Sequence, residues 1–229
     1  MRRQACALFT FATMICAAHA ASAQTPWYIT GSAGASLRMD ASQSTTFFNG
    51  FGTTGPGTNT RTYDPGPVIN LGVGYKLPLG FRVEGELGYA HYSADSASPL
   101  STNGAFPQLN GSGLALQSGG GYDQYSATGN AFYGLPIPGW VIPYVGAGFG
   151  VEHTDAQTGH FAGPGGAPRF TQLSGSATDA VVLGEVGVTI ELDERWAVVP
   201  SYRFEHVFTT NNASPNDANI FRLGVRYSF

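Results

Sequence analysis

The chain has few charged residues, few cysteines and no long apolar run. Lys and Arg number 11 and Asp and Glu 15 among 229 residues, and only 11% of the chain is charged. Such low charge excludes a disordered polyelectrolyte. The formal net charge of -4 gives no electrostatic reason to bind nucleic acid. Glycine is abundant, with 32 residues, but it has no Gly-X-Y period, and this excludes a collagen.

The first 23 residues have the pattern of a cleaved secretory signal peptide. Arg2 and Arg3 form a basic start, an apolar stretch follows over residues 5–18, and Ala21-Ser22-Ala23 is an A-x-A cleavage site. A lipid anchor on Cys16 is the alternative, but a small residue would be expected where Ile15 stands. Cys6 and Cys16 are the two cysteines, so the predicted mature domain, residues 24–229, has no thiol and no disulfide.

Strict alternation of apolar and polar residues dominates the predicted mature chain. Eight segments of about ten residues follow this period, and a tilted strand of that length crosses a bilayer. Short connections follow the second, fourth and sixth segments, whereas long, Gly- and Ser-rich connections predicted to be mobile loops cover about 40–66, 93–122, 154–179 and 209–218. We therefore predict an all-β fold: an eight-stranded antiparallel up-and-down transmembrane β-barrel with short periplasmic turns and long extracellular loops. The segments are 27–38, 69–77, 81–89, 125–133, 141–152, 182–192, 196–205 and 221–229.

The charges indicate which face of the barrel points inward. All strand charges share one face, six basic against six acidic, and the other face has none. A narrow lumen needs balanced charges because an unpaired buried charge is costly. A solvated surface has no such need, because water screens its charges. The alternative is a soluble, lipocalin-like barrel with its apolar face inside. The predicted lumen charges are Arg38, Lys76, Arg82, Glu84, Glu86, Glu152, Glu185, Glu191, Arg203, Glu205, Arg222 and Arg226.

Aromatic residues gather near the ends of the predicted strands. Trp27, Trp140 and Trp196 all fall beside the short connections, together with Phe229. Aromatic girdles are expected where a bilayer meets water, so we predict an interfacial girdle from these four residues. The β-propensity of aromatic residues explains their presence in strands, but not the placement of all three tryptophans at one end.

Three short motifs resemble the outer-membrane β-barrel family related to the OmpA transmembrane domain. Pro143 to Gly150 reads PYVGAGFG and is similar to the fifth strand of that family, and Tyr202-Arg203-Phe204 is similar to a YRY segment of its seventh strand. The resemblance implies residence in the outer membrane of a Gram-negative bacterium, contact with lipid and lipopolysaccharide, and recognition by the barrel-assembly machinery. Full OmpA-type proteins add a periplasmic peptidoglycan-binding domain, but nothing follows Phe229 in this sequence, so we expect no cell-wall anchoring. The resemblance gives the insertion signal as Phe221, Leu223, Val225, Tyr227 and Phe229.

For such a barrel we expect a non-enzymatic role in membrane integrity and surface display, with Arg and Glu side chains filling the lumen. A small pore is one alternative. A lipid A-modifying enzyme is another, because some eight-stranded barrels deacylate lipid A with a His and a Ser two residues later. His206 lies near the outer rim, but Phe208 occupies the position of that Ser.

No metal or cofactor is expected, and the partner of the loops is left open. His91, His153 and His206 share one face but lie on alternate strands about 10 Å apart, too far for one ion with bonds of about 2 Å. In the first loop Phe47, Phe48 and Phe51 are candidates for adhesion to a host or cell surface, and packing within the loop is the alternative.

Overall fold

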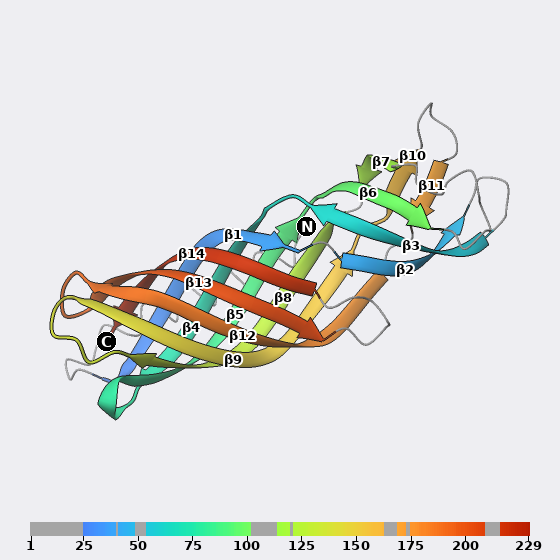
Figure 1. The fold of residues 1–229 in the computed structure, drawn as a ribbon. Helices are drawn as coiled ribbons and strands as arrows, with labels where there is room; N and C mark the ends of the chain where they lie inside the picture. Colours follow the sequence, from blue (N-terminus) through green and yellow to red (C-terminus); the bar gives the residue numbers. More distant parts are fainter. Residues whose placement is uncertain are drawn as a thin grey trace, which may run out of the picture.

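The computed structural model describes residues 25–39, 41–48, 54–101, 114–119, 121–162, 169–172, 175–208 and 216–229. Eight antiparallel strands close into a barrel in the order β1-β14-β13-β12-β9-β8-β5-β4 (Figure 1). The predicted signal peptide lies outside the described residues. The barrel strands are β1 (Trp27–Arg38), β4 (Gly66–Lys76), β5 (Phe81–Tyr92), β8 (Tyr122–Gly134), β9 (Val141–Ala156), β12 (Gly175–Glu191), β13 (Trp196–Phe208) and β14 (Asn216–Ser228).

The first and last strands pair with each other and close the barrel. Their ladder runs from Tyr28 opposite Ser228 to Arg38 opposite Ala218. Each of the remaining six barrel strands also pairs with one strand on either side, so the barrel has no open backbone edge. The predicted eight-stranded up-and-down barrel is confirmed.

Beyond the barrel, three of the long connections contain further strands. These pair into a six-stranded sheet in the order β11-β10-β7-β6-β3-β2 (Figure 1). Long loops were predicted there, but these strands were not. Pairing into hairpins gives the backbone N–H and C=O groups of these long connections hydrogen-bond partners, even where the composition is typical of turns. The strands are β2 (Ala41–Phe48), β3 (Thr54–Tyr63), β6 (Ala94–Ser101), β7 (Leu114–Gly119), β10 (Gly159–Ala162) and β11 (Arg169–Gln172).

At the opposite end the connections are tight, as predicted. A 3-10 turn, η2 (Pro78–Gly80), joins β4 to β5, and its Leu79 has φ 63°. Between β12 and β13 the Asp193 carboxylate accepts hydrogen bonds from the backbone N–H of Arg195 and of Trp196, both at 2.7 Å. No helix in the described part of the chain is long and apolar enough to cross a membrane.

The two faces of the barrel wall have opposite polarity. On the outer face Val73, Val145 and Leu223 are 53%, 50% and 61% exposed. On the inner face Glu185 and Arg226 are 4% and 6% exposed. A water-soluble barrel would bury the apolar side chains and expose the charges. The structure therefore excludes the soluble alternative and confirms the predicted orientation.

Candidate functional site in the barrel lumen

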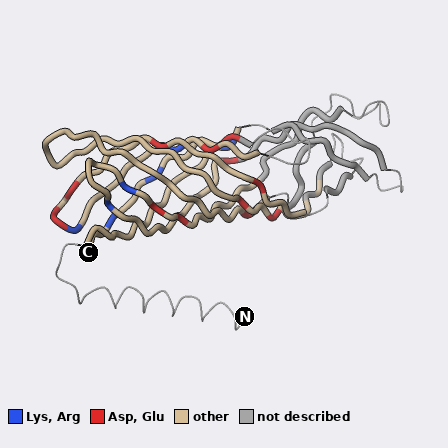
Figure 2. Tube along the Cα trace, turned by 90° about the horizontal axis from the view of Figure 1, so that it is seen from below, with Lys and Arg blue, Asp and Glu red and all other residues tan. Residues whose placement is uncertain are grey.

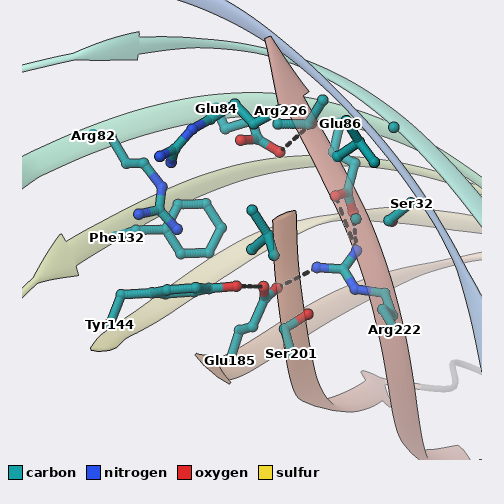
Figure 3. A pocket seen from close by; sticks show the side chains of 15 residues that line it. Ser32, Arg82, Glu84, Glu86, Phe132, Tyr144, Glu185, Ser201, Arg222 and Arg226 are labelled. Carbon is teal, nitrogen blue, oxygen red and sulfur yellow. Dashed lines mark hydrogen bonds and ion pairs between the residues drawn. The ribbon is translucent and has the colours of Figure 1, made fainter. Parts of the chain in front are cut away.

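The middle of the lumen contains two arginines that share two glutamates. The Arg203 guanidinium lies 2.5 Å from Glu86 and 2.9 Å from Glu185, measured from nitrogen to oxygen. Arg222 lies 3.0 Å from Glu86 and 2.5 Å from Glu185. Tyr144 donates a further hydrogen bond of 2.7 Å to Glu185 (Figure 3). These five side chains come from β5, β9, β12, β13 and β14, so the network links five strands across the lumen.

Towards the six-stranded sheet, a second pair fills the lumen. Arg38 donates to Glu152 at 2.8 Å and also to the side chain of Gln124. The Arg38 guanidinium lies over the rings of Tyr92 and Tyr122, which stack at 4.7 Å between centroids. Another carboxylate, Glu205, lies between this pair and the central network, 3.4 Å from Arg203.

Towards the short turns the charges have different partners. Arg82 lies between two aromatic rings, 4.4 Å from the Phe132 centroid and 4.2 Å from that of Tyr144. Arg226 lies over the Tyr28 ring at 5.4 Å, and Glu84 accepts a hydrogen bond of 3.0 Å from Thr30. A cavity of about 40 Å³ is lined by residues of this group and of the central network (Figure 3).

Charged positions follow much of the length of the barrel trace (Figure 2). Ten of the twelve predicted lumen charges lie in the three groups just described. Lys76 and Glu191 do not: both are exposed, because each is the last residue of its strand and lies at the short-turn rim. Alternation gives the correct face for these two residues, but it carries no information on how far a residue lies from the rim along the barrel axis.

The lumen also contains tyrosines and amides that were not proposed as site residues. Tyr28 and Tyr92 are almost completely buried, and Tyr144, Gln124 and Asn130 are buried as well. The three tyrosines occupy the same alternation phase as the lumen charges of their strands, and Gln124 and Asn130 occupy the inward phase of β8, which has no lumen charge. That phase was the available signal, and Tyr and Gln were overlooked because they carry no formal charge.

Aromatic pairs lie at the short-turn rim. Trp27 packs edge-on against Tyr75 at 5.0 Å, and Trp196 packs against Tyr227 at 4.8 Å between ring centroids. Trp140 is 66% exposed, and the Phe229 ring contacts Tyr227 at 5.3 Å. Rings in these positions are amphipathic or apolar and suit the boundary between bilayer and water.

The predicted insertion signal forms the second half of β14. Phe221, Leu223 and Val225 are exposed on the outer face, and Tyr227 and Phe229 end the row at the short-turn rim. The backbone of Phe229 pairs with β1, because its C=O accepts from Thr25 and its N–H donates to Trp27.

The three rim histidines have acidic or hydroxyl partners that the sequence had not indicated. His91 Nδ1 lies 2.8 Å from Asp123, and His206 Nδ1 lies 2.6 Å from Asp217, each across one strand pair. His153 Nδ1 lies 2.7 Å from Thr178. The described residues contain no group of three or more His, Cys, Asp or Glu side chains placed to hold one metal ion.

A closed eight-stranded barrel with an apolar outer wall, an aromatic rim and a charged interior is an integral β-barrel of the outer-membrane type. The family model of the outer membrane protein beta-barrel domain matches residues 6–229. The chain belongs to this family.

Solved structures of similar fold include three bacterial proteins. Neisserial surface protein A is 18% identical, with a TM-score of 0.50, and 90% of this chain and 98% of that chain are covered. Ail of Yersinia pestis is 15% identical (TM-score 0.44, 89% and 99% covered). The N-terminal barrel of Pseudomonas aeruginosa OprF is 16% identical (TM-score 0.40, 90% and 98% covered). At these identities the likeness concerns the fold alone. No curated protein sequence matches the chain.

Proposed function

We propose that this protein is a non-enzymatic structural barrel that stabilises the outer membrane and displays its long connections at the cell surface. The observation that carries the proposal is the filled lumen: Arg203 and Arg222 each bridge Glu86 and Glu185 across the barrel. An eight-stranded barrel is only wide enough for its own side chains, and here those side chains are crosslinked. The cavity of about 40 Å³ beside them does not amount to a channel.

Passage of an ion would require these contacts to break. Hydrogen bonds between charged partners are roughly twice as strong as neutral ones, and both guanidiniums make several. The Arg38–Glu152 pair obstructs the lumen a second time, nearer the six-stranded sheet. We therefore disfavour the small-pore alternative.

Planar-bilayer recording with the purified protein tests the closed lumen. We expect no stable conductance from the unmodified protein. A double variant, Glu86→Ala with Arg222→Ala, removes one bridge without leaving a partner charge behind and should open more often. A matched double variant at the exposed rim, Lys76→Met with Glu191→Gln, should behave as the unmodified protein. Large, stable steps from the unmodified protein would refute the proposal.

Export and insertion are part of the same proposal. Residues 1–23 act as the signal peptide, Phe221 to Phe229 is recognised by the barrel-assembly machinery, and the apolar outer wall contacts phospholipid and lipopolysaccharide. Deletion of Phe229 should lower the folded fraction in cells, read from heat-modifiable migration on gels. Refolding of the same variant into detergent should be nearly normal. Equal losses in both assays would indicate a stability defect rather than lost recognition.

A second candidate is hydrolysis of a lipid ester at the outer rim, and it rests on one observation. The Asp217 carboxylate lies 2.6 Å from His206 Nδ1, in the position of a group that orients a general base. Phe208, two residues further, supplies no nucleophile. Incubation with lipopolysaccharide should release no acyl chains. Release that is lost in His206→Ala would favour the enzyme instead.

A further inference from the structure

The three lumen groups differ in charge balance. Arg203 and Arg222 match Glu86 and Glu185 one for one, through four ion pairs of 3.0 Å or less. The group nearest the short turns contains Arg82 and Arg226 but only one carboxylate, Glu84. Its formal charge is therefore +1, and it lies inside a wall whose outer face is apolar.

The two arginines of this group have no acidic partner at close range. In the part of the chain that the structure describes, neither Arg82 nor Arg226 forms an ion pair within 4.0 Å, although ion pairs hold Arg38, Arg203 and Arg222. Glu84 instead accepts from Thr30. The aromatic rings beside Arg82 and Arg226 stabilise a cation only weakly compared with a carboxylate. Arg226 is buried and Arg82 is half-buried, and a guanidinium removed from water requires more compensation than these rings give.

Both arginines line the cavity of about 40 Å³, with Arg222 and three carboxylates, Glu84, Glu86 and Glu185. Within the described part of the chain, Nε of Arg222 and Nε of Arg226 have no hydrogen-bond partner, and these two residues are only 8% and 6% exposed. The hydroxyl-bearing residues Ser32 and Ser201 also line the cavity. Arg203 does not line the cavity but also binds Glu86 and Glu185. Counted with Arg203, four guanidiniums face three carboxylates, so one guanidinium charge around the cavity is unmatched.

We propose that this cavity binds one small monovalent anion of halide size, held by Arg82, Arg226 and Arg222, with chloride as the physiological ligand. One water-sized particle needs roughly 10–15 Å³ of such volume, so the space suits a monatomic anion with one or two waters. Three carboxylates line the same cavity and oppose binding. Two of them, Glu86 and Glu185, are each bound by Arg203 and Arg222, so Glu84 is the main competitor. The anion would supply the negative charge that this group lacks.

The first measurement uses the unmodified protein in detergent, crystallised with sodium bromide. We expect an anomalous bromine peak between Arg82, Arg226 and Arg222. The melting midpoint should also rise when bromide replaces gluconate at constant ionic strength, by roughly 4 °C for each tenfold increase above the dissociation constant. Absence of the peak together with equal midpoints in both salts would mean that water alone occupies the cavity.

Two substitutions that change the charge around the cavity in opposite directions distinguish specific anion binding from a general effect of salt. Arg226→Met should abolish the dependence of the midpoint on bromide. Glu84→Gln, which is nearly isosteric and removes the competing charge, should lower the bromide concentration needed for half the shift. Should Arg226→Met not fold, Arg82→Gln takes its place. Bromide dependence that is the same in all folded variants would overturn the proposal.

Discussion

At the scale of single residues, the lumen depends on a few guanidiniums that each have several partners. Arg203 contacts Glu86, Glu185 and Glu205, which come from three different strands. Removal of one partner from a buried network leaves charge uncompensated, and this costs more than the network contributes as a whole. The free-energy cost of substituting Arg203 therefore says more about how the network stabilises the barrel than the number of its ion pairs does.

Arg203→Met should destabilise the barrel by about 3–5 kcal/mol, because three carboxylates lose their shared partner inside the wall. Urea unfolding in lipid vesicles measures the effect. Lys76→Met is the matched control, since Lys76 is exposed at the rim, and it should change the free energy of unfolding by no more than about 0.5 kcal/mol. Similar losses in the two variants would contradict the assignment of Arg203 to a buried network.

Asp193 provides a prediction about pH. Backbone N–H groups of Trp196 and Arg195 donate to its carboxylate and hold the pKa of Asp193 below its ordinary value. A depressed pKa stabilises the folded state above the pKa of the unfolded chain, about 3.9, and this contribution disappears as pH falls through the folded pKa. Asp193→Asn should therefore be less stable than the unmodified protein at pH 7, and the difference should shrink below about pH 4. Urea midpoints of both proteins across pH test this, and a constant difference would be evidence against it.

Alternation predicted which residues face the lumen, but not which of them meet. Glu86 contacts Arg222, which lies on a strand far away in sequence, and this partnership depends on the stagger of eight tilted strands. Alternation carries no signal for that stagger. The same limitation placed Lys76 and Glu191 with the lumen charges, although they lie at the rim.

At the scale of strands, glycines make room for aromatic rings inside the wall. A Cβ added at Gly74 would lie 2.1 Å from Cζ of Tyr28, which is completely buried on the adjacent strand. The abundance of glycine on the inner face was visible in the sequence, and the ring that each glycine accommodates was not. The strands that pair beyond the barrel were missed for a related reason: they depend on pairing between hairpins, which local composition does not reveal.

Gly74→Ala should destabilise the barrel by about 1–3 kcal/mol, because the Tyr28 ring must move within a packed lumen. Gly85→Ala is the matched control, since a Cβ there meets nothing within 4 Å. Gly85→Ala should be neutral or slightly stabilising. Chemical unfolding of both variants under one condition makes the comparison, and equal effects would contradict the proposed packing of Tyr28 against Gly74.

At the scale of the whole molecule, the barrel inverts the usual arrangement of a soluble protein. Its outer wall is apolar over the middle of the strands, and its charges lie inside or at the rims. Such a wall is stable only when hydrocarbon surrounds it, so the cost of a charge on the outer face must depend on depth. That dependence distinguishes a membrane-embedded wall from one that merely is apolar.

Leu87 and Leu192 allow this to be measured. Leu87 lies on the outer face in the middle of β5 and is 66% exposed, whereas Leu192 lies at the short-turn rim and is 64% exposed. Leu87→Arg should cost about 2–4 kcal/mol and Leu192→Arg about 0–1 kcal/mol, because only the first places its charge near the bilayer centre. Reversible unfolding from vesicles gives both values. Equal costs would mean that exposure rather than depth controls the penalty, and that the middle of the outer wall does not lie in hydrocarbon.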